Sequence, residues 1–194
     1  MALTIRILAA GVLGLALAAP ATAEPQKTAH STVDLIAEQS SAPAGGRVTL
    51  GFHLDPDTTW HAYWANPGDA GKEPSIKWTV PEGLEVGELS FPTPHLLPFG
   101  ELNTYGFEDN ELFLAEMTVP AGLTAGEEIR IEGAARWIVC DDEVCVPERA
   151  TLSLTMTVGD GDIDAANAPL FAEAREKQPE SVDWPAEFLS LIHI

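Results

Sequence analysis

The sequence predicts an all-β protein, an immunoglobulin-like antiparallel β-sandwich with a short C-terminal helical tail. Three observations support this fold class. Apolar and polar residues alternate with a period of two through most of residues 32–158, clusters of Pro, Gly and Asn separate the alternating segments, and no long amphipathic helix interrupts them. About seven or eight short strands at this spacing are typical of an immunoglobulin-type sandwich. A closed barrel is the alternative that the same pattern allows.

The individual strands are predicted from residues that alternate onto one face. These positions are Val33, Leu35 and Ala37, then Val48, Leu50, Phe52 and Leu54, and then Ile76, Trp78 and Val80. Residues 112–119 are apolar on both faces, which indicates a central strand. The clearest pair of strands covers residues 129–140 and 151–158, where Leu152, Leu154, Met156 and Val158 are expected to face the core.

The character of the chain changes after the last strand. Residues 159–162 form a Gly/Asp turn, and residues 165–177 have the Ala, Glu and Arg content of a short helix that ends before Pro179. We expect a β-sandwich domain over residues 24–159 and a helical tail or linker over residues 160–194, which a longer native chain would extend.

The N-terminus carries the pattern of a secretory signal peptide over residues 1–23. Arg6 supplies a basic start, residues 7–19 are apolar, and Ala21-Thr22-Ala23 is a small-residue cleavage site. We therefore expect the mature chain to begin at Glu24 and to be periplasmic. If the native chain continues into a membrane domain, the full-length form would be anchored in the inner membrane.

The composition is strongly acidic, with 30 Asp and Glu against 10 Lys and Arg and a formal net charge of -20. Nucleic acids and anionic lipids bind positive surfaces, so neither is expected as a partner. A solubility role explains the same acidity without any binding function.

Cys140 and Cys145 are the only cysteines of the chain, and an exported protein with two cysteines normally forms one disulfide. Four residues separate them, so they would face each other across a hairpin with Cα atoms about 4.5 to 5.5 Å apart, which a disulfide accepts. As a staple, so short a loop would contribute only roughly 2 kcal/mol. The same pair can instead exchange with a partner disulfide.

The residues around the cysteines bear on this choice. Asp141, Asp142 and Glu143 would disfavour a thiolate in the free domain and damp its reactivity, or they form a plain solvated turn. Pro147 has no backbone N–H and weakens the ladder beside Cys145, which would leave that edge open for docking.

Three motifs together resemble one protein family. The run Trp137-x-x-Cys140-x4-Cys145-x-Pro147-Glu148 is similar to the cysteine hairpin of the periplasmic N-terminal domain of the DsbD and ScsB thiol:disulfide interchange proteins. Residues 60–69, Trp-His-Ala-Tyr-Trp-Ala-Asn-Pro-Gly-Asp, resemble a strand and turn of the ScsB-like branch, and residues 103–107, Asn-Thr-Tyr-Gly-Phe, resemble the cap loop. The resemblance covers roughly residues 30–158.

The resemblance implies an immunoglobulin-like thiol:disulfide oxidoreductase module without a cofactor. It would accept electrons from a membrane-embedded thiol reductase domain and pass them to oxidised periplasmic thioredoxin-like or disulfide isomerase proteins. Cys140 and Cys145 would be the redox pair, with Tyr105 and Phe107 shielding them. Trp137, Pro147 and Glu148 would support the hairpin.

This sequence departs from DsbD in two ways. Its cysteine loop is one residue shorter, and the cap aromatic is Tyr105 after Thr104. Both features favour the ScsB-like branch. Which cysteine attacks first and which proteins accept the electrons do not follow from the sequence. Nor does a choice between general disulfide reduction, cytochrome maturation and copper tolerance.

A non-enzymatic periplasmic binding module with a structural disulfide is the alternative function, and a copper-related role is one form of it, since thiolate and imidazole ligands suit copper. The five histidines are His30, His53, His61, His95 and His193. They are scattered without metal-site spacing, so no metal site is predicted. Packing in the core of a sandwich explains the tryptophans.

Overall fold

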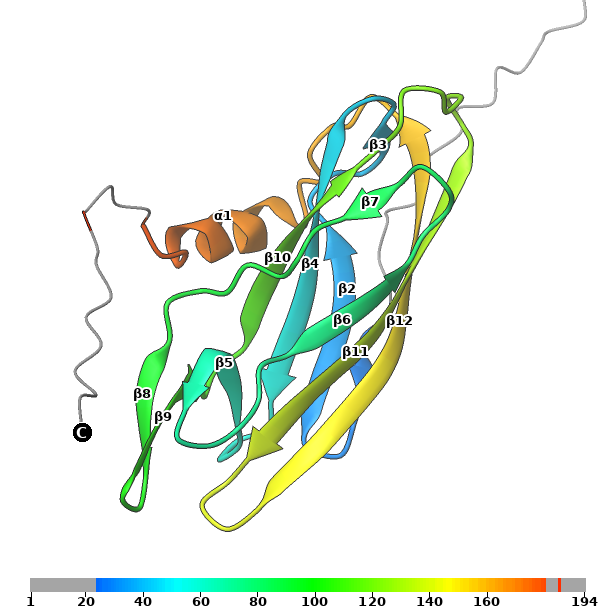
Figure 1. Cartoon of the computed structure of the whole chain (residues 1–194). Coiled ribbons are helices and arrows are strands. Elements are labelled where there is room, and N and C mark those ends of the chain that lie inside the picture. The colour runs from blue at the N-terminus through cyan, green and yellow to red at the C-terminus, as the bar shows by residue number, and fades with distance from the viewer. Residues whose placement is uncertain (1–23, 181–184, 186–194) are drawn as a thin grey trace, which may run out of the picture.

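The computed structural model of the chain describes residues 24–180 and 185, which form two β-sheets and one helix (Figure 1). The signal peptide expected over residues 1–23 and most of the residues after 180 lie outside the described part. Within the described part, no helix combines the length and the apolar character needed to cross a membrane.

The first sheet has the strand order β1-β2-β4-β10-β7. Its strands are β1 (Gln26–Lys27), β2 (Ser31–Ala37), β4 (Arg47–Pro56), β10 (Glu111–Thr118) and β7 (Glu85–Val86). All of their pairings are antiparallel.

The second sheet has the order β3-β12-β11-β5-β9-β8, and β6 also pairs with β11. Its strands are β3 (Ala42–Pro43), β12 (Cys145–Gly159), β11 (Glu128–Cys140), β5 (His61–Gly68), β9 (Leu102–Phe107), β8 (His95–Phe99) and β6 (Ser75–Thr79). Only the short contact between β3 and β12 is parallel. Two separate sheets of mainly antiparallel strands confirm the predicted sandwich.

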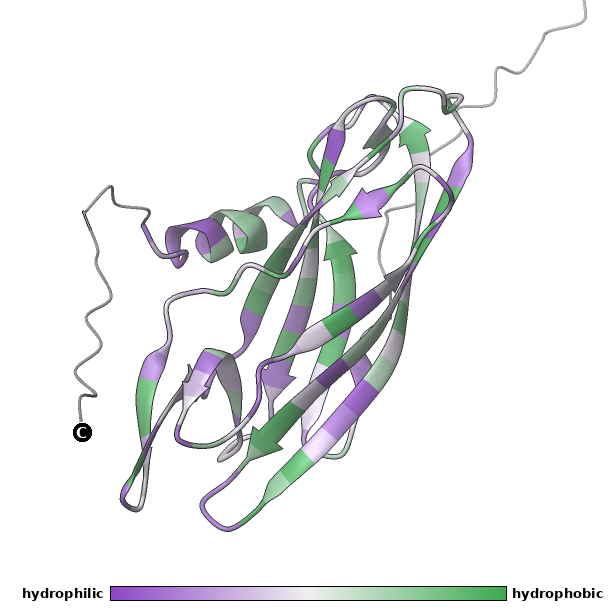
Figure 2. Cartoon of the chain, in the orientation of Figure 1, coloured by the Kyte–Doolittle hydropathy of each residue, from purple (hydrophilic) through white to green (hydrophobic). Residues whose placement is uncertain are grey.

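The core lies between the two sheets and is built from the alternating residues of each strand. Hydrophobic and hydrophilic residues alternate along the strands in Figure 2. Val33, Leu35, Val48 and Leu50 of the first sheet are all fully buried, as their alternation predicts. Leu152, Leu154, Met156 and Val158 of β12 are buried against them from the second sheet.

The helix α1 (Ala168–Glu176) covers the outer face of the first sheet. Its Phe171 is completely buried and forms a second apolar cluster with Ala174 of the helix and with Ile36, Leu112 and Leu114 of the sheet. This explains why residues 112–115 are apolar on both faces, since one face meets the core and the other meets the helix. Further along the strand, Glu116 and Thr118 are exposed on the outer face, so burial on both sides does not extend over all of residues 112–119 as predicted. The helix expected in the C-terminal tail is therefore packed on the sandwich.

Gly51 of β4 makes room for this contact. A Cβ atom at Gly51 would lie 2.6 Å from Leu112 Cδ1 and 3.0 Å from Phe171 Cζ. Any larger residue would push the helix away from the sheet.

No helix of the described residues covers the outer face of the second sheet, and two strands share one edge of β11. β5 pairs with Val139 and Cys140, whereas β6 pairs with residues 132–136. Trp137 and Ile138 lie between these two pairings, where the chain that links β5 to β6 leaves the ladder. The cysteine end of β11 therefore lies on the same open face as the cleft beside Trp137 and Ile138.

Candidate functional site

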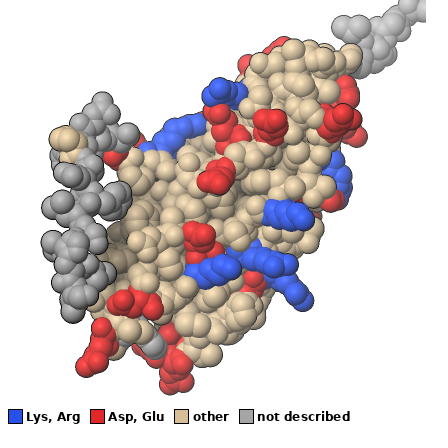
Figure 3. All heavy atoms as spheres, viewed as in Figure 1, with Lys and Arg blue, Asp and Glu red and all other residues tan. Residues whose placement is uncertain are grey.

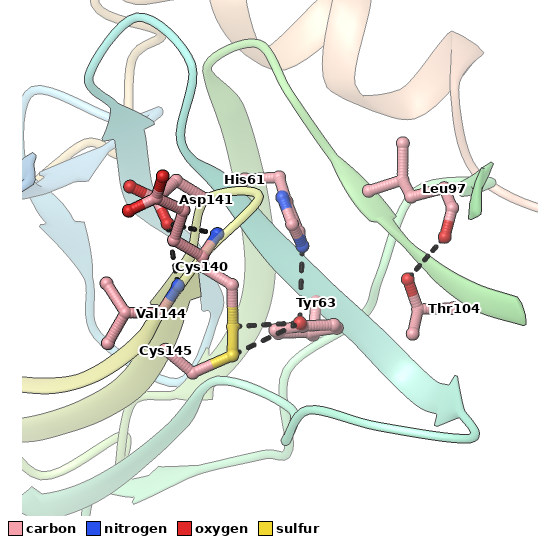
Figure 4. Close-up of a disulfide and its surroundings, with 9 residues drawn as sticks. His61, Tyr63, Leu97, Thr104, Cys140, Asp141, Val144 and Cys145 are labelled. Carbon is pink, nitrogen blue, oxygen red and sulfur yellow. Dashed lines mark hydrogen bonds between the residues drawn. A yellow bond between two sulfur atoms is a disulfide. The ribbon is translucent and has the colours of Figure 1, made fainter. Parts of the chain in front are cut away.

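The two cysteines lie at the tip of the β11–β12 hairpin and form a disulfide (Figure 4). Cys140 ends β11 and Cys145 begins β12, and the two residues are direct cross-strand partners. Their sulfur atoms are 2.02 Å apart and their Cα atoms 4.1 Å apart, slightly closer than the expected range. The hairpin geometry predicted from the spacing is therefore present.

The loop between the cysteines is organised by Asp141. Its Oδ1 accepts backbone N–H groups from Glu143 at 2.9 Å and Val144 at 2.8 Å, and its own N–H donates to the Val144 carbonyl at 3.0 Å. These N–H groups hold the pKa of Asp141 below its ordinary value. The tip of the hairpin is thus a hydrogen-bonded turn whose backbone favours the charged form of Asp141, and it presents the side chain of Val144 to solvent.

The two sulfurs have different surroundings. Cys140 is only 2% exposed, whereas Cys145 is exposed. The hydroxyl of Tyr63 donates a hydrogen bond to Cys140 Sγ at 2.9 Å and lies 3.9 Å from Cys145 Sγ. An incoming thiolate can therefore approach Cys145 more easily than Cys140, which is buried and accepts the hydrogen bond from Tyr63.

Tyr63 is in turn bonded to His61, whose Nε2 lies 3.2 Å from its hydroxyl oxygen. Burial raises the pKa of the Tyr63 phenol, so it stays protonated as a donor. Burial also lowers the pKa of His61, although Glu108, Asp142 and Asp141 act against this. The Tyr63 O–H is already the donor in the hydrogen bond to sulfur, so its oxygen can only accept from His61. Neutral His61 therefore carries its proton on Nε2 and donates a hydrogen bond to the Tyr63 oxygen.

The alternation of β5 places these two side chains at the disulfide. His61 pairs with Cys140 across the ladder, and Ala62 pairs with Val139 on the side of the core. Tyr63, one residue further, returns to the face of the disulfide. The chain after β5 then closes over its ring at Gly71, which has φ +94° and whose Cβ would lie 2.3 Å from Tyr63 Cε1. Only glycine fits this position.

The two residues expected to shield the disulfide lie on β9. Tyr105 pairs with Leu96 of β8, is 38% exposed, and has its ring beside Gly68. Phe107 is 2% exposed and packs edge-to-face on Phe113 in the core, so it supports the sheet from inside and does not cover the sulfurs.

The residue that contacts the sulfurs, Tyr63, was missing from the sequence-based site. Its sequence signal is weak. It is a polar aromatic residue two positions from His61 in a strand, and only the pairing of β5 with β11 shows where it points. β9 lies next to Tyr63 because Gly106 pairs with it across the ladder. Within the β8–β9 hairpin, buried Thr104 donates its Oγ1–H to the Leu97 carbonyl at 2.6 Å (Figure 4).

The supporting residues lie on β11 and β12 beneath the hairpin tip. Trp137 is 2% exposed and donates its Nε1–H to Ser31 Oγ at 3.0 Å and to Glu148 Oε2 at 3.1 Å. Glu148 is buried and also accepts bonds from Thr28 Oγ1, the His30 N–H and Ser31 Oγ. This carboxylate ties β12 to the start of β2. Pro147 is exposed and faces Ile138 across the ladder.

No cluster of three or more His, Cys, Asp or Glu side chains suited to a metal ion occurs within residues 24–180 and 185. The chemistry that the described site can supply is that of the sulfurs, the phenol and the imidazole.

Comparisons with known proteins address the fold and the family of this chain. A search of curated proteins found no significant match. Among solved structures, the chain is similar to the N-terminal periplasmic domain of ScsB from Proteus mirabilis, with 20% identity and a TM-score of 0.64. The match covers 84% of this chain and 62% of that structure, so this chain spans less than two thirds of the ScsB domain. A yeast GGA1 GAE domain also matches, with 11% identity, a TM-score of 0.37 and coverage of 71% of this chain and 99% of that one, which is too distant to inform function.

The sequence profile of the family described as "Thiol:disulfide interchange protein DsbD, N-terminal" matches residues 32–157. These residues contain both sheets except their terminal pieces, together with the cysteine hairpin and Tyr63. The chain thus belongs to the family of N-terminal domains of the thiol:disulfide interchange protein DsbD.

Proposed function

We propose that this protein is a periplasmic thiol:disulfide interchange module that passes electrons from a membrane-embedded thiol reductase domain to oxidised periplasmic proteins of the thioredoxin-like or disulfide isomerase type. In this proposal residues 24–159 are the redox domain, and residues 160–194 are a helical tail or linker. The main support for this proposal is that Cys145 is exposed whereas Cys140 is buried. This difference gives the two cysteines separate roles, with Cys145 reacting with partners and Cys140 resolving the mixed disulfide.

Reduction of the domain begins at Cys145. A thiolate of the electron donor attacks Cys145 Sγ, a new sulfur–sulfur bond forms, and the Cys140–Cys145 bond breaks with its electron pair moving to Cys140. The second thiol of the donor then attacks the mixed disulfide. The donor leaves oxidised, and both cysteines of this domain are reduced.

Delivery of electrons reverses these steps. The Cys145 thiolate attacks the disulfide of an oxidised partner, one partner thiol leaves, and a mixed disulfide through Cys145 results. Cys140 then attacks Cys145, which releases the reduced partner and restores the intramolecular disulfide. Two electrons and two protons pass to the partner in each cycle.

Tyr63 assists by stabilising the leaving sulfur. When Cys145 is attacked, negative charge develops on Cys140 Sγ, which already accepts a hydrogen bond from Tyr63. A hydrogen bond to a charged acceptor is stronger than one to a neutral acceptor, so this contact favours the charged product. His61 supports it by donating to the same hydroxyl oxygen. Tyr63 and His61 are thus positioning residues for the proposed exchange.

Shielding of the disulfide involves two tyrosines in this proposal. The Tyr63 hydroxyl contacts Cys140 Sγ from β5. The role of Tyr105 as an outer cap that moves away on docking stays a prediction. The half-exposed ring of Tyr105 lies on a hairpin that faces solvent, which is compatible with such movement.

A trapping experiment tests the roles of the cysteines. In Cys140→Ser the exposed Cys145 can attack a partner disulfide, but nothing resolves the product, so we expect a stable mixed disulfide with an oxidised thioredoxin-fold protein. In Cys145→Ser the remaining Cys140 is buried, so little adduct should form. Mass spectrometry of the adducts would count against these roles if it found equal trapping by both variants.

The equilibrium reduction potential separates the proposal from the alternative of a binding module with a structural disulfide. Exchange-active disulfides have potentials of roughly -200 to -280 mV, whereas structural disulfides in secreted proteins usually lie below about -300 mV. We expect a value in the first range when the mature domain is titrated against a thiol buffer. A value in the second range would favour the structural role.

A further inference from the structure

The cations of this acidic protein fall into two groups. Nine of the ten Lys and Arg residues lie in the described part, since Arg6 falls outside it. Five of them form ion pairs with carboxylates, namely Lys27, Arg47, Arg130, Arg175 and Lys177. Lys72, Lys77, Arg136 and Arg149 have no ion pair with any carboxylate of the described residues.

These four cations share one place, the open outer face of the second sheet. Arg136 of β11 pairs with Arg149 of β12 on one side and with Ser75 of β6 on the other. Lys77 follows two residues along β6, on the same face. Figure 3 shows Lys and Arg side chains over the face that β6, β11 and β12 form.

A cleft opens at the centre of this group, beside Trp137 and Ile138, where neither β5 nor β6 pairs with the edge of β11 that faces away from β12. Its volume is about 560 Å³, and its lining includes Lys72, Ser75, Arg136, Ile138, Pro147 and Arg149. Glu73 and the internally bonded Glu148 also line it. The cleft therefore combines a small apolar floor with a rim that is mainly cationic.

The arginine pair is costly for the free protein. Like charges directly opposite each other on neighbouring strands destabilise a sheet, and Arg136 and Arg149 occupy such positions although acidic residues outnumber basic ones threefold in the chain. Two guanidinium groups on one face match carboxylates, because each can form two parallel hydrogen bonds to such a group. A carboxylate ligand would offset the repulsion between Arg136 and Arg149 and could accept paired hydrogen bonds from both guanidinium groups.

The cleft lies on the same face as the disulfide. Three cross-strand pairs follow one another on that face: Cys140 with Cys145, Ile138 with Pro147, and Arg136 with Arg149. The first and last pairs are four residue steps apart along β11, a distance of about 13 Å. Beyond the cysteine pair, at the end of the row away from the arginines, the cysteine loop is acidic and contains Asp141, Asp142 and Glu143.

We propose that the cationic cleft binds an acidic segment of the redox partner while a sulfur of that partner reacts with Cys145. This inference rests on the proposed function and adds to it a recognition element outside the disulfide. The cleft end of this face is cationic and the cysteine-loop end is acidic, so a complementary partner can dock in one register only. Such a partner carries carboxylates about 13 Å from its reactive sulfur.

Thiol peptides test this directly. One peptide has a single cysteine, a flexible spacer of four Gly and Ser residues and two glutamates, and its matched partner has two glutamines instead; both have blocked termini. The spacer lets the glutamates reach about 17 Å from the cysteine. The rate at which each peptide forms a mixed disulfide with the oxidised domain is measured by mass spectrometry after acid quenching.

The comparison uses a ratio that cancels the intrinsic reactivity of each peptide thiol. We expect the rate ratio of the Glu peptide to the Gln peptide to fall about fivefold from the wild-type domain to Arg136→Gln/Arg149→Gln. The control Arg47→Gln/Arg130→Gln removes the same charge from two exposed cations that do not line the cleft and should leave the ratio near the wild-type value. High salt should also reduce the wild-type ratio.

The possible results separate this inference from the proposed function. If neither peptide reacts with the wild-type domain, the proposed exchange function fails. If both react but the two double variants change the ratio equally, exchange stands and the cationic cleft is not a recognition element. The Arg136→Gln/Arg149→Gln variant removes a like-charge pair, so thermal unfolding should show it at least as stable as wild type, which excludes misfolding as the cause.

Discussion

The outer faces of the two sheets differ in what covers them and in how their charges are paired. On the first sheet, α1 covers Ile36, Leu112 and Leu114 with Phe171. The charges near this helix are also paired, as Glu38 with Arg175 and Glu111 with Lys177. On the second sheet, no helix of the described residues covers the corresponding face. This face carries the disulfide, one exposed ion pair between Arg130 and Glu132, and four cations that have no ion pair among the described residues.

This difference separates the residues that stabilise the domain from those available to a partner. Apolar burial and satisfied charges on the first sheet favour the folded state. Unpaired like charges and an accessible sulfur on the second sheet add little to stability, which is typical of sites whose interactions are completed by a ligand. Substitutions on the two faces should consequently affect different measurements.

Phe171→Ala should have the largest effect and should act on stability alone. Its side chain is completely buried between α1 and the sheet, so its removal leaves a cavity and lowers the free energy of unfolding by about 3 to 5 kcal/mol. Denaturant unfolding measures this loss. The neighbouring Leu170 is 43% exposed, and Leu170→Ala should change stability by less than about 0.5 kcal/mol.

The reduction potential of the disulfide provides the complementary readout for Phe171→Ala. It should match that of the wild type, because the helix lies on the other sheet. A shifted potential in a still folded variant would show that the two faces are coupled.

Glu148→Ala should cause the second-largest loss of stability, because this buried carboxylate bonds β12 to β11 and to residues 28–31 on the inner side of the open face. It accepts bonds from Trp137 Nε1, Thr28 Oγ1, Ser31 Oγ and the His30 N–H. Alanine leaves several of these donors without a partner, and we expect the free energy of unfolding to fall by roughly 3 kcal/mol. Glu148→Gln keeps one acceptor oxygen and should lose about half as much. Equal stability of all three proteins would mean that water replaces the carboxylate at no cost.

Tyr63→Phe should affect the exchange rate more than stability. The variant keeps the aromatic ring but removes the hydrogen bond to Cys140 Sγ. Attack on Cys145 should slow by about tenfold, since a hydrogen bond to a charged group is worth roughly 1.5 kcal/mol or more. Stopped-flow reduction by a small dithiol measures the rate.

Tyr105 offers a matched control on the neighbouring strand. Tyr105→Phe should leave that rate within about twofold of wild type, because no hydrogen bond joins Tyr105 to either cysteine in the described structure. Tyr105→Ala should speed the reaction if its ring is an outer cap. A slower reaction in Tyr105→Phe than in Tyr63→Phe would reassign the positioning role to Tyr105.

The sequence predicted those features that depend on neighbouring residues. The alternation of Leu152, Leu154, Met156 and Val158 is local, and it correctly assigned the inner face of β12. The hairpin with Cys140 opposite Cys145 follows from four intervening residues and was also correct.

Features that join distant segments could not be predicted in the same way. The contact between Tyr63 and Cys140 spans 77 residues and requires knowing that β5 pairs with β11. The bond from Ser31 to Glu148 spans 117 residues. The two apolar faces of residues 112–119 indicated burial on both sides, but they did not identify α1 as the cover. Tertiary pairing, and not local pattern, decides each of these contacts.

The smallest predicted effect is a pH dependence on the covered sheet. His53 of β4 lies opposite Asp34 of β2, with 2.9 Å between His53 Nδ1 and Asp34 Oδ1. The hydrogen bond with Asp34 raises the pKa of His53 above its ordinary value, although burial opposes this. The folded protein therefore binds this proton more tightly than the unfolded chain. The resulting stabilisation is fully present below the unfolded pKa of about 6.5 and is lost as the pH rises through the higher folded pKa.

Asp34→Asn should remove most of this pH dependence. We expect the wild type to lose roughly 0.5 kcal/mol of stability, relative to the variant, between slightly acidic and mildly alkaline pH. The two proteins are compared by urea unfolding at several pH values, with Arg47→Gln as a control for a charge change on the same sheet. The reduction potential, corrected for the protons of the two thiols, should be equal in wild type and Asp34→Asn, because His53 belongs to the sheet that α1 covers whereas the disulfide belongs to the other. A potential that followed the titration of His53 would show that the covered face regulates the open one and would overturn the separation between them.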